Sequence, residues 1–393
     1  MNYAERMDRV KASDVREILK IAGCPEIISF AGGLPAPELF PVEKIREATE
    51  QVLDACAGTA LQYCASSGYA RLRQQIAERM EKKVGAKMDP ANILPTCGSQ
   101  QGLDFCARLF VNPGDVVLME SPSYLGAINA FEICQPNFVS VPTDDEGMIM
   151  EELEKTLETV KNVKMIYVIP DFQNPSGRTW SLERRKKFME IVSRYEIPVV
   201  EDNPYGELRY RGEYLPCLKS MDTKGLVIYM GTFSKILAPG YRIGWMCADG
   251  EVYEKLELLM SAAALQASTI NMMIISRFME IADLDEHVDR IRECYKHRCE
   301  VMMQAMAEYF PPEAKYTVPE GGLFTWVELP DYIDTKAMAA QALEQQVAYV
   351  PGIGFFPNGE KKNCMRLNYS NMPDERIVEG IKRLAQVIRN NLR

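Results

Sequence analysis

Histidine is nearly absent from this sequence, and its scarcity argues against several classes of enzyme. Only His287 and His297 occur among 393 residues, and both stand in a charged helical pattern that predicts a surface position. A Ser-His-Asp triad needs a histidine as its base, and histidine-rich metal centres need several. We therefore expect neither kind of site, and we expect no metal.

An excess of positive charge is also missing. The chain carries 45 Lys and Arg against 55 Asp and Glu, which gives a net charge of -10. Binding to nucleic acid depends on neutralising phosphates with Lys and Arg. The composition therefore favours a small-molecule partner over a nucleic acid.

Long apolar runs and paired cysteines are lacking as well. No run approaches the ~20 residues that span a bilayer, and residues 1–9 have no apolar core of the kind a signal peptide carries. The 11 cysteines are an odd number without a C-x-x-C pair, which favours reduced thiols over a disulfide scaffold. We expect a cytoplasmic protein without a membrane partner.

What the sequence does contain is a regular alternation of short apolar runs and helical stretches through its middle. The runs that resemble strands are residues 115–119, 164–169, 197–201 and 226–230. This rhythm predicts an α/β fold in which a mostly parallel sheet is flanked by helices. After about residue 290 the pattern changes to a long charged helix, 289–309, and short strands such as 322–327 and 364–369. The change predicts a smaller α+β domain.

Small, polar and aromatic residues follow the predicted strands. They form the segments 121–124, 174–177, 202–205 and 232–235. Open α/β sheets bind ligands beyond the carboxyl ends of their strands. We therefore expect these segments to line one site.

Lys235 ends one of these strands in a segment that suits an aldehyde cofactor with a phosphate group. An amine attacks an aldehyde only when it is unprotonated, so a lysine that acts near neutral pH needs surroundings that disfavour its charge. Thr232, Ser234 and Arg242 would donate hydrogen bonds to a phosphate dianion beside it. An isolated Ser-Lys pair before a Pro-Gly turn would instead indicate an ordinary surface turn.

The wider segment decides between these interpretations. Residues 231–245 read Gly-Thr-Phe-Ser-Lys-Ile-Leu-Ala-Pro-Gly-Tyr-Arg-Ile-Gly-Trp. They closely resemble the lysine segment of fold-type I, pyridoxal-5′-phosphate-dependent aminotransferases of class I/II, in particular the 2-aminoadipate and kynurenine aminotransferase branch. The resemblance runs from about Ala12 to the carboxyl end. It implies that Lys235 is the catalytic lysine and holds pyridoxal 5′-phosphate as an aldimine.

The resemblance also implies a domain organisation. Residues 45–290 would form the large cofactor-binding domain, and residues 291–393 the small C-terminal domain. Residues 1–44 would be an arm that contributes to the small domain and the substrate site.

Further cofactor contacts follow from the same resemblance. Asp202 would keep the pyridine nitrogen protonated, without which the ring withdraws electrons poorly. Tyr205 and Asn174 would contact the phenolic oxygen, and Tyr124 would stack on the ring face. Taken singly, Asp202 could end a strand in an Asx turn, and Tyr124 could be a core aromatic.

Residues 96–103, Thr-Cys-Gly-Ser-Gln-Gln-Gly-Leu, lead directly into a helical pattern, where free backbone N–H groups favour an anion. Gly98, Ser99 and Gln100 would therefore cradle the phosphate together with Thr232, Ser234 and Arg242. Tyr63 resembles a tyrosine that reaches the phosphate of a neighbouring subunit, which implies a homodimer. The run Cys-Ala-Ser-Ser that follows it, residues 64–67, departs from the usual Gly-Pro-Thr-Glu type.

On the substrate side, Arg366 matches the family's carboxylate-binding arginine, and Gly33 lies in a segment whose backbone approaches the substrate. Asn174 would contribute to substrate binding too. Arg16 matches an arginine that, in 2-aminoadipate-type relatives, can face the substrate side chain. It lies off the apolar face of its predicted helix, so a solvated arginine beside Glu17 is the alternative.

These residues together predict an aminotransferase that moves an amino group between an L-amino acid and a 2-oxo acid such as 2-oxoglutarate. The donor stays open among 2-aminoadipate, glutamate, aromatic and branched amino acids. A β-lyase or decarboxylase of the same fold is an alternative, because the substrate bond held perpendicular to the ring decides the reaction. An aminotransferase-like regulatory domain is disfavoured, since the Gly-Gly-Leu-Pro segment begins at Gly32, too early for a preceding DNA-binding domain.

Overall fold

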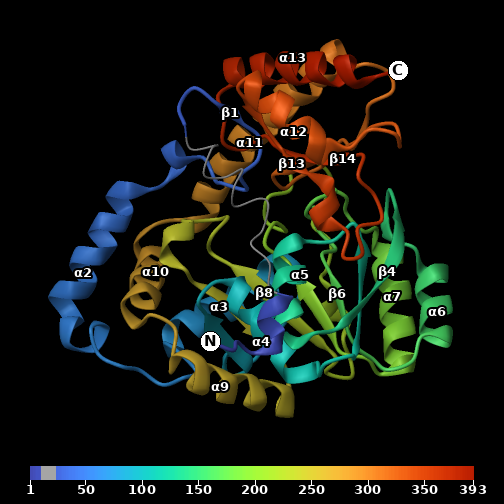
Figure 1. Ribbon diagram of the computed structural model, residues 1–393. Helices are drawn as coiled ribbons and strands as arrows, with labels where there is room; N and C mark the ends of the chain where they lie inside the picture. The colour runs from blue at the N-terminus through green and yellow to red at the C-terminus, as the bar shows by residue number, and fades with distance from the viewer. Residues whose placement is uncertain (10–23) are drawn as a thin grey trace.

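The computed structural model describes residues 1–9 and 24–393, and it confirms the predicted α/β fold (Figure 1). The larger of its main sheets has eight strands in the order β2-β9-β8-β7-β6-β3-β4-β5. These strands are β2 (Ile93–Thr96), β3 (Val116–Ser121), β4 (Asn137–Asp144), β5 (Gly147–Met148), β6 (Val163–Val168), β7 (Val199–Asp202), β8 (Val227–Thr232) and β9 (Gly244–Cys247).

The sheet is mostly parallel, as the sequence predicts. β3 pairs in parallel with β4 and β6, and β7 pairs in parallel with β6 and β8, whereas β9 runs antiparallel to β2 and β8. Successive side chains of a strand enter opposite cores: Val117 and Met119 pack in one, and Leu118 packs in the other. Because both faces are buried, the central strands appear in the sequence as continuous apolar runs.

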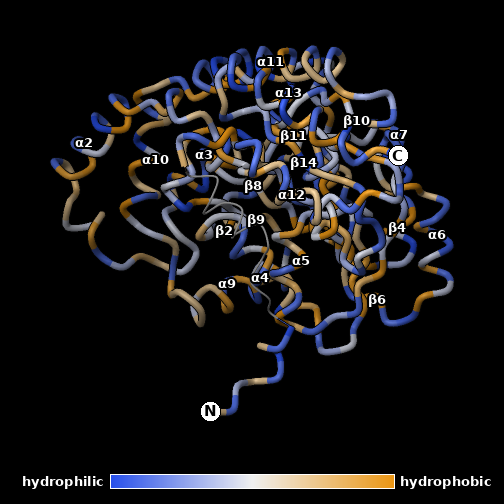
Figure 2. Tube along the Cα trace, turned by 45° about the horizontal axis from the view of Figure 1, so that its top comes forward, coloured by the Kyte–Doolittle hydropathy of each residue, from blue (hydrophilic) through white to orange (hydrophobic). Residues whose placement is uncertain are grey.

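Helices cover both faces of this sheet. On one face lie α4 (Ser99–Phe110), α5 (Leu125–Phe131) and α9 (Gly250–Ala264); on the other lie α6 (Met150–Thr159), α7 (Leu182–Tyr195) and α8 (Leu218–Met221). The helices α2 (Val42–Ala60), α3 (Ala70–Val84) and α10 (Thr269–Ile281) build a further core beside β2 and β9. Figure 2 shows hydrophilic and hydrophobic residues alternating along outer helices such as α6, as one-sided burial requires.

The C-terminal part of the chain carries a four-stranded antiparallel sheet in the order β10-β11-β14-β13. Its strands are β10 (Lys315–Tyr316), β11 (Phe324–Glu328), β13 (Val350–Pro351) and β14 (Cys364–Asn368), and its helices are α11 (Leu284–Tyr309), α12 (Thr335–Glu344) and α13 (Asp374–Asn391). The early strand β1 (Ile28–Ser29) pairs in parallel with β12 (Val347–Ala348). An N-terminal segment therefore packs against this C-terminal region.

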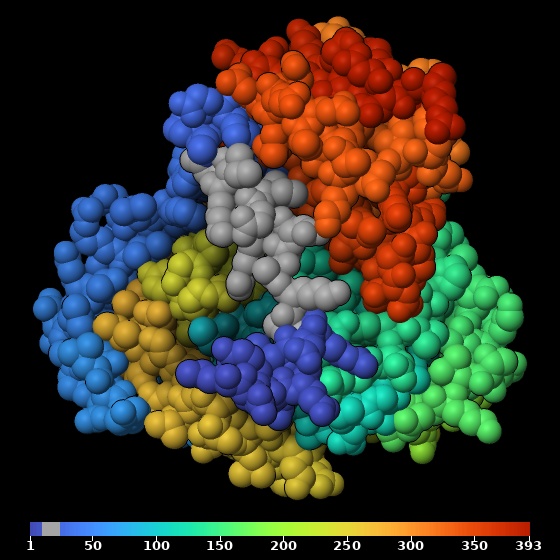
Figure 3. Space-filling view, viewed as in Figure 1, coloured from blue at the N-terminus to red at the C-terminus, as the bar shows by residue number. Residues whose placement is uncertain are grey.

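Short 3-10 helices complete the fold. They are η1 (Glu5–Asp8), η2 (Pro37–Leu39), η3 (Pro90–Asn92), η4 (Glu132–Cys134), η5 (Pro239–Tyr241) and η6 (Gly352–Phe355). Residues 1–9 are exposed and lie on the surface beside α4, α5 and α9 (Figure 3). Over the part of the chain that the structure describes, no helix is both long and apolar enough to cross a bilayer.

The surface position predicted for His287 is wrong. Its side chain lies on the buried stripe of α11, between Leu284 and Ile291 at helical spacing, and it is only 2% exposed. Burial lowers the pKa of His287 to about 4, and the charge of Arg290 contributes. The charged residues around it in the sequence belong to the other face of the helix. His297 is exposed, as predicted, and its Nε2 lies 2.6 Å from Asp374 Oδ2.

Candidate active site

A cavity of about 310 Å³ lies at the carboxyl ends of β3, β6, β7 and β8 and brings together most of the residues predicted from the sequence. The predicted residues that line it are Gly33, Ser99, Gln100, Tyr124, Asn174, Asp202, Tyr205, Thr232, Ser234, Lys235, Arg242 and Arg366. Gly98 lies beside the guanidinium of Arg242, a member of this group. The cavity has the size and place expected of a small-molecule site in an open α/β sheet.

Lys235 follows β8 and is half-buried, with its Nζ donating to the carbonyl oxygen of Gly33 at 2.7 Å. Burial lowers the pKa of Lys235 to about 8, and the positive charges of Arg366 and Arg242 lower it further in the same direction. About a tenth of this amine is therefore unprotonated at pH 7. It can act as a nucleophile and as a base.

Asp202 is the last residue of β7, and its buried side chain lines the same cavity. Tyr167 Oη donates to its Oδ2 at 2.8 Å, while its Oδ1 has no hydrogen-bond partner among the residues described. Burial raises the pKa of Asp202 to about 6, against the lowering effect of Tyr167. A buried carboxylate oxygen without a partner is costly, which indicates that a ligand donor completes the site.

Asn174 joins the two sheets through a chain of hydrogen bonds. Its Nδ2 donates to Tyr205 Oη at 3.2 Å, and its Oδ1 accepts from Arg366 Nη1 at 2.9 Å. Tyr205 follows β7, whereas Arg366 stands in the middle of β14. The loop after β6 therefore connects a residue of the large sheet with a residue of the C-terminal sheet.

Two aromatic rings and one carbonyl fix the Arg366 guanidinium. Its Cζ lies 4.1 Å from the ring centre of Phe324 and 5.2 Å from that of Phe355, and its Nη2 donates to Ala31 O at 2.8 Å. Nε has no partner in the described part of the chain. Burial lowers the pKa of Arg366 to about 10, so the side chain still carries its charge at neutral pH. It is a preorganised cation for a carboxylate.

The part of the cavity beside the start of α4 suits an anion. Gly98, with φ +69°, caps the twelve-residue helix α4, which begins at Ser99. A Cβ at position 98 would lie 2.4 Å from Arg242 Nη2, so glycine allows the guanidinium to approach the helix end. Thr232 Oγ1 donates to Ser234 Oγ at 3.0 Å on the same side. Free backbone N–H groups, two hydroxyls and a guanidinium are the donors that a phosphate requires.

These groups fit pyridoxal 5′-phosphate. The free Oδ1 of Asp202 suits a protonated pyridine nitrogen, and the Gly98 and Arg242 end suits the phosphate. Tyr205 Oη and Asn174 Nδ2 are donors of the kind that a phenolic oxygen accepts. Within the described residues, no group of three or more His, Cys, Asp or Glu could hold a metal ion.

The structure does not bring every predicted residue into the cavity. Tyr63 is 75% exposed and lines a separate groove with Leu61 and Ile270. Arg16 belongs to residues 10–23, which lie outside the described part of the chain. Sequence reasoning missed the apolar lining residues, which are Leu125, Ile169, Pro204, Pro239 and Phe324.

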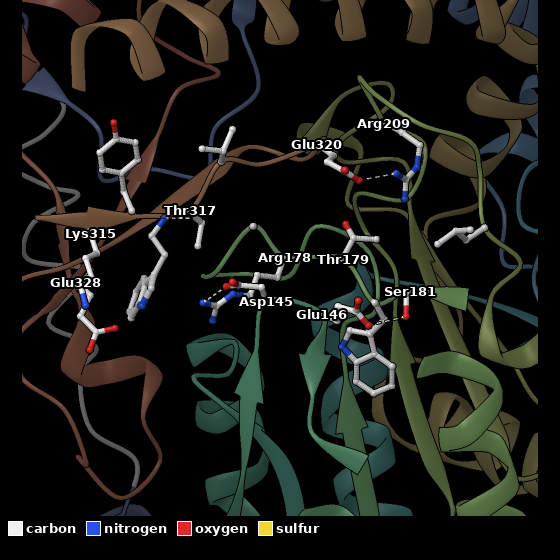
Figure 4. Close-up of a pocket in the computed structure, with 16 residues that line it drawn as sticks. Asp145, Glu146, Arg178, Thr179, Ser181, Arg209, Lys315, Thr317, Glu320 and Glu328 are labelled. Atoms are coloured by element: carbon white, nitrogen blue, oxygen red, sulfur yellow. Dashed lines mark hydrogen bonds and ion pairs between the residues drawn. The ribbon is translucent and has the colours of Figure 1, made fainter. Parts of the chain in front are cut away.

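A larger hollow of about 610 Å³ lies elsewhere, between β10 and β11 of the C-terminal sheet and the loops around residues 145 and 178 (Figure 4). None of the predicted residues that the structure describes lines it. Four of its charged residues pair with each other: Arg178 Nη2 lies 2.9 Å from Asp145 Oδ1, and Arg209 Nη1 lies 3.2 Å from Glu320 Oε2. Size alone would therefore have pointed to the wrong place.

Comparison with known proteins agrees with this geometry. Residues 26–384 match the family model "Aminotransferase class I and II". An aromatic-amino-acid aminotransferase of Thermococcus litoralis is 46% identical over 100% of this chain and 95% of its own.

Solved structures agree too. Kynurenine aminotransferase of Pyrococcus horikoshii has a TM-score of 0.96 at 43% identity, covering 100% of this chain and 98% of its own. The α-aminoadipate aminotransferase of Thermus thermophilus, solved with a phosphopyridoxyl-leucine, has a TM-score of 0.92 at 37% identity, covering 99% and 97%. The chain therefore belongs to the class I and II aminotransferases: it is an aminotransferase, and pyridoxal 5′-phosphate is its cofactor.

Proposed function

We propose that this enzyme transfers the amino group of an L-amino acid to a 2-oxo acid such as 2-oxoglutarate, and that Lys235 is the lysine to which the cofactor is attached. The donor candidates are 2-aminoadipate, glutamate, aromatic and branched amino acids. The relatives named for aromatic amino acids, kynurenine and α-aminoadipate support this range. The observation that carries the proposal is a half-buried lysine that lines one cavity with two arginines and with a buried aspartate whose Oδ1 is free among the described residues.

Each cofactor contact has a separate role in this proposal. Asp202 holds the ring nitrogen protonated, and Tyr205 and Asn174 bind the phenolic oxygen. Tyr124 lies against the ring face. When bound, pyridoxal phosphate supplies the electron-withdrawing ring that makes the substrate Cα–H bond acidic.

The phosphate lies at the start of α4 in this proposal. It is bound by Ser99, Gln100, Thr232, Ser234 and Arg242, with Gly98 leaving room for the guanidinium. Binding of the phosphate by several donors would hold the cofactor in the cavity while the Lys235 side chain moves.

Lys235 moves the proton. As a free amine, its Nζ would accept the proton from the substrate Cα, and as an ammonium it would donate that proton in the return step. The pKa of about 8 suits both directions, because neither protonation state is strongly disfavoured near neutral pH. The hydrogen bond from Nζ to Gly33 O gives the free amine a defined position near the arm.

Arg366 binds the substrate α-carboxylate and fixes its orientation. Its bond to Asn174 and its contacts with Phe324 and Phe355 hold the guanidinium before substrate arrives. Gly33 brings backbone close to the substrate. We further propose that Arg16 pairs with an acidic substrate side chain and swings away from an apolar one.

The active unit in this proposal is a homodimer, in which Tyr63 contacts the cofactor phosphate of the partner subunit. The exposure of Tyr63 and of its neighbour Leu61, which is 70% exposed, supports an interface there. Residues 1–44, 45–290 and 291–393 are proposed as the arm, the cofactor-binding domain and the small domain. A cytoplasmic location stays a prediction.

A screen of amino donors with 2-oxoglutarate as acceptor tests the proposal. Glutamate should accumulate with at least one donor class, in proportion to the oxo acid formed from that donor, and Lys235→Ala should form none. Release of ammonia or carbon dioxide without glutamate formation would favour a lyase or a decarboxylase.

A further inference from the structure

Glu120 is a carboxylate in the apolar core of the large sheet. It is the fifth residue of β3, on the face where Val116 and Leu118 pack against the helices α6 and α7. The strand pattern therefore calls for an apolar side chain at this position. Glu120 is nevertheless only 1% exposed.

Three donors surround the Glu120 carboxylate. Trp180 Nε1 donates to its Oε1 at 2.9 Å, and Ile169 N and Gln173 Nε2 donate to its Oε2 at 3.1 and 3.4 Å. All three partners belong to the segment that follows β6, and Ile169 lines the active-site cavity. The ionised carboxylate satisfies every one of these bonds.

Gln173 continues the network around the loop. Its Nε2 also donates to Pro122 O at 2.6 Å, and its Oε1 accepts from Ser176 N at 2.9 Å and Ser176 Oγ at 2.6 Å. Its backbone N–H donates to Arg178 O at 2.8 Å. The side chain of Gln173 therefore closes the turn that contains Asn174.

Asn174 links this network to the cavity, which it lines. Its neighbour Gln173 is bonded inward to Glu120, while Asn174 itself is bonded outward to Tyr205 and Arg366. A change at Glu120 can reach the cavity through two covalently adjacent residues.

We infer that Glu120, acting through Gln173, is a positioning residue that holds Asn174 against Arg366 and Tyr205. The inference rests on the proposed roles of these three residues in binding the cofactor and the substrate carboxylate. Neither Glu120 nor Gln173 lines the cavity, so neither touches the reacting atoms.

The position of Glu120 also makes its charge sensitive to pH. Burial raises the pKa of Glu120 to about 7, while its three hydrogen bonds and the positive charge of Arg178 act in the opposite direction. Protonation below this pH places an O–H among groups that are themselves donors. One of the three bonds is then lost, and the hold on Gln173 weakens.

The first test follows the ionisation directly on the full-length holoenzyme. The chain has 3 tryptophans, so the indole N–H signals of a ¹⁵N-labelled sample are few, and Trp180→Phe identifies the signal of Trp180. This signal should titrate with a midpoint near pH 7 in the wild type and should not titrate in Glu120→Gln. A Trp180 signal that is constant between pH 5.5 and 8.5, a range chosen to span about 1.5 units around that midpoint, would contradict the ionisation of Glu120 near neutral pH.

The second test asks whether the network reaches the site. Glu120→Gln places an amide NH₂ against N–H donors, so the KM for the amino donor should rise about tenfold with a smaller change in kcat. The pH titration of the bound cofactor's visible absorbance should shift by about half a unit, because donors at the phenolic oxygen move. Gln173→Leu should give the same two changes, and it provides a variant that leaves the buried carboxylate in place.

Glu201→Gln is the matched control. Glu201 is also a fully buried carboxylate near the end of a strand, with a pKa raised to about 7, but it accepts from Leu218 N and Lys219 N, away from the Asn174 loop. It should leave the cofactor titration and the KM unchanged. Equal shifts in Glu201→Gln, or none in Glu120→Gln and Gln173→Leu, would overturn the inference. A wild type without cofactor absorbance would contradict the proposed function instead, and the Trp180 titration would still decide whether Glu120 ionises as inferred.

Discussion

The two sheets that meet at the active site contribute groups of different chemical character. The ends of the eight-stranded sheet carry Asp202 and Lys235, whose pKa values burial moves toward neutrality, to about 6 and about 8. The C-terminal sheet carries Arg366, whose pKa falls only to about 10 and which keeps its charge. Groups whose proton affinity matters thus lie on one sheet, and a group that holds a fixed charge lies on the other. The comparison teaches that cofactor chemistry and substrate orientation can be damaged separately.

Lys235→Ala should give the largest effect, because it removes both the attachment point and the proton-transferring amine. Turnover should fall by at least about 10⁴-fold, while the phosphate-binding residues still retain cofactor. Steady-state rates and cofactor content of the same sample check this. Residual turnover close to that of the wild type would mean that another group moves the proton.

Asp202→Asn should also impair the cofactor chemistry of the large sheet, but through the ring nitrogen and not through the proton-transferring amine. The amide removes the anion that faces the ring nitrogen but preserves volume and the contact with Tyr167, so kcat should fall by about 10²–10⁴-fold with the fold intact. Single-turnover rates measure the loss, and Glu201→Gln on the opposite face of β7 is the control. Near wild-type rates in Asp202→Asn would show that this carboxylate serves only the local structure.

Arg366→Lys should impair substrate binding by the C-terminal sheet and leave cofactor binding intact. A lysine keeps the charge but cannot bind a carboxylate in two places, so kcat/KM should fall about a hundredfold for every amino acid. Cofactor affinity, measured by absorbance titration, should stay unchanged. A loss of cofactor affinity together with kcat/KM would contradict the separation of cofactor binding on the large sheet from carboxylate binding on the C-terminal sheet.

Arg16→Ala should give the smallest and most selective change. Charge-assisted pairs contribute ~1.5–3 kcal/mol, so kcat/KM for 2-aminoadipate or glutamate should fall about ten- to a hundredfold, and leucine should be nearly unaffected. Measuring both substrates on one preparation provides the internal control. An equal loss for both would mean that Arg16 supports the fold and does not contact the substrate side chain.

The positions of the chemistry-bearing segments were predictable from the strand pattern, whereas the roles of Asp202 and Arg366 were predicted from the family resemblance. Asp202 ends β7, Thr232 ends β8, and Arg366 stands in β14, each close to where the sequence pattern placed it. The apolar members of the site could not be identified in this way. Ile169 and Phe324 look like core residues in the sequence, and only the tertiary structure turns them toward a cavity.

Buried polar groups are also difficult to predict from the sequence. His287 stands among charged residues and was predicted at the surface, whereas Glu120 occupies a strand position where the pattern calls for an apolar side chain. The apolar stripe of α11 buries the first, and the loop after β6 folds over the second.

The most direct test of the central claim is to locate the lysine that carries the cofactor. The purified wild type should be yellow, borohydride reduction should abolish the visible band, and peptide mapping should find the reduced cofactor on Lys235. Reduced cofactor on any other lysine, or a protein that binds no cofactor, would contradict the account.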